Sequence, residues 1–284
     1  MGQWEWPLVI FTVLGQTSVG IIFCLWLLER KQSKLATTAT TEYQSFIKRS
    51  VLVSGVLLAV AMIASLFHLG HPLEAYRALT HLGTSWLSRE ILLFIFTFGA
   101  WAYLALLSRR PGSKMTGIMA LTSGLGFLGI ISSALIYTLP RVPAWNNLGP
   151  VIFFLMTSVI LGTLFTVFLG RKVLSSGEIK QLLNIALGSV IGSAILSLLY
   201  FSLLQVTPEG AATAQYLLAS PVFWLRATVG WVIPIFLIMN AVRKKETPQP
   251  QMILFALTCG VAGELLGRGL FYVSAVGMHI TALM

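Results

Sequence analysis

Titratable side chains gather where one long apolar run ends. Segment 51–67 is almost entirely apolar, and His68, His71 and Arg77 follow it directly, while Glu90 opens the next apolar run. A neutral imidazole can accept a hydrogen bond and then a proton near neutral pH, and a carboxylate beside water can carry that proton away. We therefore predict quinol oxidation here, with His68 as proton acceptor, because a quinol is an apolar ring and tail that must lose two protons and two electrons.

A second group of charges lies inside apolar runs. Glu264 and Arg268 are four residues apart in the stretch G-E-L-L-G-R-G, and therefore share one face of a helix. Arg226 lies inside the preceding run. Charges in membrane spans are costly and by default functional, so quinol binding is predicted for all three. Two alternatives stay open: a structural Glu264–Arg268 pair, and an Arg226 side chain that extends to the membrane interface.

Composition indicates a membrane protein. The chain has 284 residues, of which 56% are hydrophobic and 10% charged, against roughly 25% charged in soluble domains. Apolar runs of about 20 residues recur along the sequence, and each can cross about 30 Å of hydrocarbon as a helix. We predict an all-α polytopic membrane protein, a single integral membrane domain over residues 1–284 with a bundle of eight transmembrane helices. The predicted spans are roughly 7–28, 50–68, 89–107, 116–138, 150–170, 182–204, 221–242 and 252–275.

The distribution of basic residues predicts the topology. Most of the 19 Lys and Arg residues follow odd-numbered spans: Arg30, Lys31, Lys34, Lys48, Arg49, Arg109, Arg110, Lys114, Arg171, Lys172, Lys180, Arg243, Lys244 and Lys245. By the positive-inside rule these loops are cytoplasmic, so both termini face outward. The formal charge of +10 therefore reflects topology and not nucleic-acid binding. The outer loops around 69–88, 139–149 and 205–220 are predicted to dock a redox partner.

No redox centre of its own is predicted for the protein. Cys24 and Cys259 lie in apolar runs without a C-x-x-C motif, which leaves no ligand set for an iron–sulfur cluster or a structural zinc. A b-type haem needs two axial histidines on facing helices, yet only His68 lies at a predicted helix, since His81 and His279 fall in a loop and the tail. We therefore expect no haem and no metal, although a haem-bearing quinol cytochrome remains an alternative.

Two further features of the sequence are the polar residue Gln16 in the first apolar run and the absence of two similar halves. Gln16 lies within the first apolar run and is expected to be an interhelical hydrogen-bond partner. Transporters, the main alternative from another class, commonly show two similar halves and broken helices near the midplane. No convincing halves are visible in this sequence. A transporter is therefore the less favoured interpretation.

Five stretches carry a family resemblance. They are E-W-P-L-V-I-F-T-V-L-G-Q (5–16), A-S-L-F-H-L-G-H-P (64–72), L-S-R-E-I (87–91), V-P-A-W (142–145) and G-E-L-L-G-R-G-L-F-Y (263–272). With these stretches in this order, the protein resembles the membrane-anchor subunit of the bacterial anaerobic dimethyl sulfoxide (DMSO) reductase complex. Related anchors of polysulfide, N-oxide or selenate reductases are the alternatives.

The resemblance implies a role in anaerobic respiration. It implies an inner-membrane anchor that oxidises menaquinol without haem and passes electrons to an iron–sulfur subunit and on to a molybdopterin catalytic subunit. Both partners would lie on the outer, periplasmic face, and the terminal acceptor would be reduced outside this subunit. In that family the histidine of H-L-G and the glutamate opening the third span are associated with quinol; they match His68 and Glu90. His71 and Arg89 depart from the family pattern, and His71 adds a second imidazole.

Overall fold

Eight helices of the computed structural model are long and apolar enough to cross a membrane, as predicted. The structure describes residues 4–34, 41–67, 79–110, 112–243 and 248–278, and no β-strand occurs in these ranges. The elements are α1 (Trp6–Lys34), α2 (Thr41–Leu66), α3 (Trp86–Leu107), α4 (Thr116–Leu135), α5 (Gly149–Gly170), α6 (Ser176–Leu204), α7 (Pro208–Ala219), α8 (Pro221–Ala227), the π-helical turn η2 (Thr228–Val232), α9 (Ile233–Arg243) and α10 (Pro250–Val273). The segments α8, η2 and α9 together make the seventh span.

Several helices extend beyond the predicted spans. Helix α2 begins at Thr41 and α6 at Ser176, whereas apolar character begins only near residues 50 and 182. Hydropathy marks the part of a helix that lies in lipid, while its polar end can continue into water without losing backbone hydrogen bonds. The early start of α6 has a local cause, because Ser175 and Glu178 form a reciprocal capping box.

The connection around 205–220 contains a short helix that hydropathy did not predict. Helix α7 begins at Pro208, and the Thr207 hydroxyl accepts a hydrogen bond from the Gly210 N–H at 3.1 Å. A threonine N-cap followed by proline at the first helical position is a recognised start signal. One of the predicted docking loops is therefore an ordered helix.

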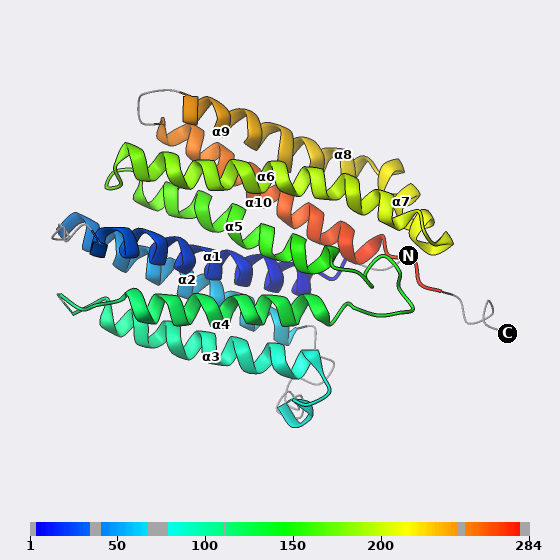
Figure 1. Ribbon diagram of the computed structural model, residues 1–284, viewed down its shortest axis with the longest axis horizontal. Helices are drawn as coiled ribbons and strands as arrows, with labels where there is room; N and C mark the ends of the chain where they lie inside the picture. The colour runs from blue at the N-terminus through cyan, green and yellow to red at the C-terminus, as the bar shows by residue number, and fades with distance from the viewer. Residues whose placement is uncertain (1–3, 35–40, 68–78, 111, 244–247, 279–284) are drawn as a thin grey trace.

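Helix α1 lies at the centre of the bundle. It packs against α2, α4, α5 and α10, while α3 and the seventh span lie at the periphery (Figure 1). Its most apolar window is 78% buried, against 22% for α3. Gly20 lets α1 approach α5 closely. A Cβ atom at this position would lie 1.9 Å from the Ser158 carbonyl oxygen on α5, which is too close for any other residue. Backbone proximity of this kind favours helix association in lipid.

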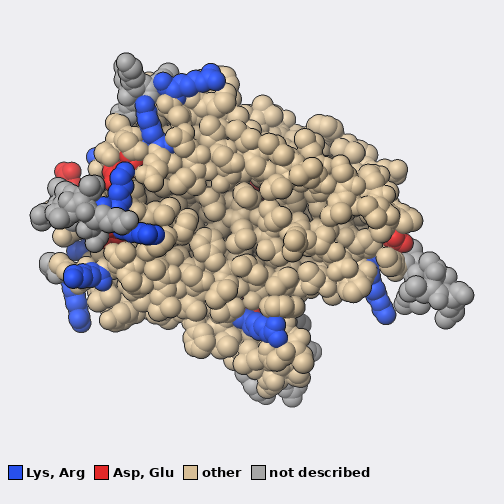
Figure 2. Space-filling model, in the orientation of Figure 1, with Lys and Arg blue, Asp and Glu red and all other residues tan. Residues whose placement is uncertain are grey.

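Basic side chains gather at one end of the bundle. Figure 2 shows most of them at the end where α1 joins α2, α3 joins α4, α5 joins α6 and α9 approaches α10. The middle of the visible face is almost free of charge, and both described ends of the chain lie at the opposite end (Figures 1 and 2). Among the residues that the structure describes, most cations that were predicted to share one membrane face therefore share one end of the bundle.

Candidate functional site

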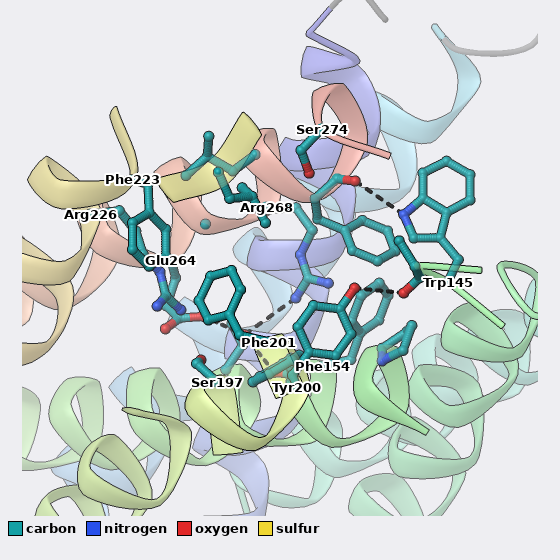
Figure 3. Close-up of a pocket in the computed structure, with 18 residues that line it drawn as sticks. Trp145, Phe154, Ser197, Tyr200, Phe201, Phe223, Arg226, Glu264, Arg268 and Ser274 are labelled. Atoms are coloured by element: carbon teal, nitrogen blue, oxygen red, sulfur yellow. Dashed lines mark hydrogen bonds between the residues drawn. The ribbon is translucent and has the colours of Figure 1, made fainter. Parts of the chain in front are cut away.

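Three of the charged residues singled out from the sequence line one pocket. Glu264 and Arg268 project from α10 and Arg226 from α8, and the three side chains face a common space (Figure 3). The pocket lies between α5, α6, α8 and α10, in the half of the bundle opposite the basic end. The space inside it that could hold atoms of a bound molecule is about 100 Å³, which is smaller than the roughly 300–1,000 Å³ of a typical ligand pocket.

The pocket walls are aromatic, with few polar groups. The rings that line it belong to Trp145, Phe153, Phe154, Tyr200, Phe201, Phe223 and Phe271. Several of these rings contact one another edge to face or stacked, as Trp145 and Phe271 do at 5.2 Å between centroids. An apolar lining with a small number of convergent polar groups is the usual design of a site for an apolar ring compound.

The backbone that carries Arg226 departs from a regular α-helix. Directly after α8 lies the π-helical turn η2 (Thr228–Val232). Pro234 has no N–H to donate to the Gly230 carbonyl, which interrupts the regular hydrogen-bond ladder at this point. A Cβ atom on Gly230 would lie 2.9 Å from the Cα of Gly263, so the two glycines let this span approach α10 closely. Turns of this kind are frequent at functional sites.

Arg226 is held against α10. Its guanidinium stacks on the Trp231 ring at 3.9 Å from the centroid. A Cβ atom on Gly267 would lie 2.8 Å from the Arg226 Nε, so the side chain occupies space that only a glycine leaves free. Arg226 is also close enough for its charge to act on Glu264. The side chain therefore forms part of the pocket wall.

Arg268 joins three helices in the buried interior. Its Nη2 donates hydrogen bonds to Gln16 Oε1 at 2.9 Å and to Thr157 Oγ1 at 3.3 Å. Its guanidinium also lies over the Phe154 ring at 3.5 Å from the centroid. Gln16 comes from α1 and Thr157 from α5, so the predicted interhelical role of Gln16 is confirmed. The two hydrogen bonds offset part of the desolvation free energy of burying this cation.

Thr157 makes more contacts than its single proton can serve at once. Its Oγ1 accepts from Arg268, and it lies within hydrogen-bond distance of Glu264 Oε2 and, at 3.0 Å, of the Phe153 carbonyl oxygen. A hydroxyl has one proton to donate. If Glu264 is ionised, Thr157 donates to it; if Glu264 is protonated, Glu264 donates to Thr157, which then donates to Phe153. Glu264 thus has a hydrogen-bond partner in either protonation state.

Glu90 lies in a separate buried cluster. Ser85 caps the start of α3, which places Glu90 in the second helical turn, where it is 5% exposed. It does not line the aromatic pocket. Its Oε1 has no hydrogen-bond partner among the described residues, and its carboxyl group interacts with the Ser133 hydroxyl. A buried carboxyl oxygen without a hydrogen-bond partner in the protein is uncommon in folded proteins.

A pair of tyrosines lies between the two clusters. The hydroxyl groups of Tyr137 and Tyr272 are 3.1 Å apart, and Tyr272 also interacts with the Thr12 hydroxyl. Both tyrosines lie close enough to Glu90 and to Arg268 to interact electrostatically with each of them. These polar groups of α1, α3 and α10, together with Tyr137 just after α4, are called the polar layer below.

Several predicted residues lie outside what the structure describes. His68, His71 and Arg77 belong to segment 68–78, and His279 to the last residues, so their roles stay predictions. His81 is exposed, and its Nδ1 is 2.9 Å from the Thr80 hydroxyl. Among the described residues, no three His, Cys, Asp or Glu side chains lie together as metal ligands.

Thr157, Tyr137 and Tyr272 were not singled out from the sequence. One signal was available for Tyr272, because it follows Glu264 and Arg268 at successive intervals of four and so shares their helical face. Thr157 offered no such signal, since hydroxyl residues are common in membrane helices and usually bond to their own backbone.

Eight spans and a buried polar site define an integral membrane subunit of the helical-bundle class. The family model described as "DMSO reductase anchor subunit (DmsC)" matches residues 1–273, and the protein belongs to this family. The family predicted from the sequence is therefore confirmed. Membership makes the protein a multi-pass anchor of the inner membrane that partners catalytic and electron-transfer subunits.

Two known relatives match along the whole sequence and a third along about half of it. The YnfH subunit of an anaerobic dimethyl sulfoxide reductase of Escherichia coli is 28% identical over 294 residues, covering 100% of this protein and 98% of the relative. The C subunit of the anaerobic dimethyl sulfoxide reductase of the same organism is 29% identical over 299 residues, with the same coverage. The C subunit of the Haemophilus influenzae enzyme is 33% identical over 151 residues, or 51% of each protein.

Proposed function

We propose that this anchor subunit binds and oxidises menaquinol. Its electrons pass to an iron–sulfur subunit and from there to a molybdopterin catalytic subunit, as in a DMSO reductase-type complex. The anchor holds the quinol and handles its protons, while the partner subunits supply the redox centres and reduce the terminal acceptor. The aromatic pocket is the proposed position of the quinol ring, because its walls suit an apolar bicyclic ring and its polar groups suit a hydroxyl.

The hydrogen bonding of Glu264 is the observation that carries this proposal. The carboxylate can take a proton from a quinol hydroxyl, because Thr157 then turns its own proton to the Phe153 carbonyl and keeps Glu264 bonded. As the proton leaves, negative charge develops on the quinol oxygen, and the cations Arg226 and Arg268 are placed to stabilise it. Oxidation of one quinol releases two protons and two electrons, and the electrons go to the iron–sulfur partner.

Glu90 and His68 are proposed to take the protons outward. Glu90 is a buried carboxylate with one free oxygen near the non-basic end of the bundle, and the family resemblance associates both residues with quinol. The same observation supports a second candidate position for the quinol ring, at the membrane edge beside these two residues. The two positions make different predictions for Glu264.

The proposed orientation places both termini and the partner subunits outside. Its support is the gathering of cations at the other end, since basic loops are retained in the cytoplasm. Two backbone N–H groups near the C-terminus stabilise the proposed docking end. The Met278 N–H donates to the Arg141 carbonyl at 2.8 Å, and the Val276 N–H donates to the Thr213 side-chain Oγ1 at 3.1 Å. These bonds tie the C-terminal segment to the 139–149 loop and to α7, which gives a partner a fixed surface.

The test uses the assembled complex in native membranes. Glu264→Gln should lower quinol-dependent turnover by about 10²- to 10⁴-fold, the usual effect of losing a general base. Turnover with an artificial soluble donor, which bypasses the quinol site, should persist. Glu42→Gln is the matched control, because Glu42 is exposed at the opposite end of the bundle.

The same assay separates the two positions of the quinol. If Glu264→Gln is active while Glu90→Gln and His68→Arg lose quinol-dependent turnover, the ring lies at the edge and not in the pocket. If all three variants oxidise quinol normally, the proposed role of this subunit in quinol oxidation is wrong.

A further inference from the structure

We propose that the Tyr137–Tyr272 pair is a proton relay from the aromatic pocket to Glu90. The inference rests on the proposed quinol oxidation and names the residues that connect its two carboxylates. It gives a function to the polar layer, whose buried groups are costly to place in a membrane bundle.

The layer can be followed residue by residue. From the pocket it runs through Glu264 to the Thr157 hydroxyl, where Arg268 donates to the same oxygen. Arg268 in turn interacts electrostatically with Tyr272 and Tyr137, whose hydroxyl groups are 3.1 Å apart. Thr157 and Tyr272 are buried and Tyr137 is partly buried, so most of the route is shielded from bulk water.

The far end of the layer is Glu90. Its charge acts on both tyrosines, and its Oε1 is free to receive a hydrogen bond. Three helices contribute, with Glu90 from α3, Tyr137 from just after α4 and Tyr272 from α10. The aromatic wall of the pocket separates the pair from the quinol ring, because Tyr137 packs on Phe154 and Phe271 from behind.

Hydroxyl groups suit this task. Each can accept a proton on one lone pair while donating its own to the next group, so neither tyrosine has to ionise and no electron leaves the ring. For each proton that the quinol releases into the relay, one proton is delivered to Glu90, while the electrons go to the iron–sulfur partner. Arg268 cannot release its proton and acts as a fixed positive charge beside the route. Bound water molecules between Thr157 and Tyr272, and between the tyrosine pair and Glu90, would complete the two steps that no direct hydrogen bond makes.

Tyrosine-to-phenylalanine variants test the relay because they remove the hydroxyl and keep the ring packing. Tyr272→Phe and Tyr137→Phe should each lower quinol-dependent turnover by about tenfold or more, as loss of a proton-transfer group does. Binding of a short-chain naphthoquinol and turnover with an artificial donor should stay unchanged. Proton transfer would then limit the rate, so the slowing in deuterium oxide should increase. Tyr103→Phe is the control, since Tyr103 lies on α3 and is 54% exposed.

The outcomes distinguish the relay from the proposed function. Normal turnover in both tyrosine variants, with Glu264→Gln inactive, would overturn the relay and leave quinol oxidation in the pocket intact. Reduced naphthoquinol binding in the tyrosine variants would also overturn it, because the pair would then be building the pocket. If Glu264→Gln, Glu90→Gln and His68→Arg are all fully active with quinol, the proposed function has failed independently of the tyrosines.

Discussion

Replacing Thr157 by valine removes one hydroxyl group from the centre of the proposed site. That hydroxyl accepts a hydrogen bond from Arg268 and is the hydrogen-bond partner of Glu264 in either protonation state of the carboxyl group. The rest of the Thr157 side chain is packed in the buried face of α5. Valine keeps nearly the same shape. The variant therefore separates the hydrogen bonding of the site from its packing.

The size of the effect follows from the two bonds that are lost. Interhelical hydrogen bonds in membrane proteins contribute about 0.6 kcal/mol on average and up to about 1.7 kcal/mol. Loss of the bonds to Arg268 and Glu264 should therefore destabilise the subunit by about 1–3 kcal/mol. Because Glu264 also loses the partner that satisfies it when protonated, quinol-dependent turnover of Thr157→Val should fall by roughly 10- to 100-fold.

The assay measures quinol-dependent and artificial-donor turnover in the same membranes, together with thermal unfolding of the purified complex. Thr157→Ser should restore turnover, since it returns the hydroxyl. Thr163→Val is the matched control: Thr163 is buried on the same helix, but its hydroxyl bonds only to carbonyls of its own helix, Val159 at 2.7 Å and Ile160 at 2.9 Å. If Thr157→Val and Thr163→Val behave alike in both measurements, the reasoning about the shared hydroxyl is refuted.

Two further predictions concern the bundle itself. Gly20→Leu should reduce the amount of assembled complex, because even a Cβ atom there would lie 1.9 Å from the Ser158 carbonyl oxygen; Gly188→Leu on α6, where a Cβ meets nothing within 4 Å, should assemble normally, as immunoblots of membranes would show. Reporter fusions at the C-terminus should be active only outside the cytoplasm, and a fusion after Lys114 only inside; the reverse pattern would contradict the proposed orientation.

The sequence by itself determined the spans and the division of charge. A helix in lipid must be apolar over about 20 residues, so hydropathy alone identifies it. Cations avoid crossing the membrane, and their positions therefore predict which loops share a face. The same logic singled out Glu90, Glu264 and Arg268, because charges are rare in apolar runs and each stands out by type alone.

The tertiary structure decided which of these charges belong together. Glu264 and Arg226 come from different spans, and they meet because Gly230 and Gly263 let η2, which follows Arg226, approach α10 closely. Glu90 is kept apart from that pocket, although the sequence placed both groups in the same half of the membrane.

Hydroxyl groups could not be assigned from the sequence. Thr157 and Thr163 look alike in the printed sequence, and both are buried on α5, yet one bonds to its own backbone and the other bridges two charged side chains. The difference lies only in what the neighbouring helix presents at that depth. Packing geometry is set by side-chain volumes from all eight spans together, and no local pattern records it.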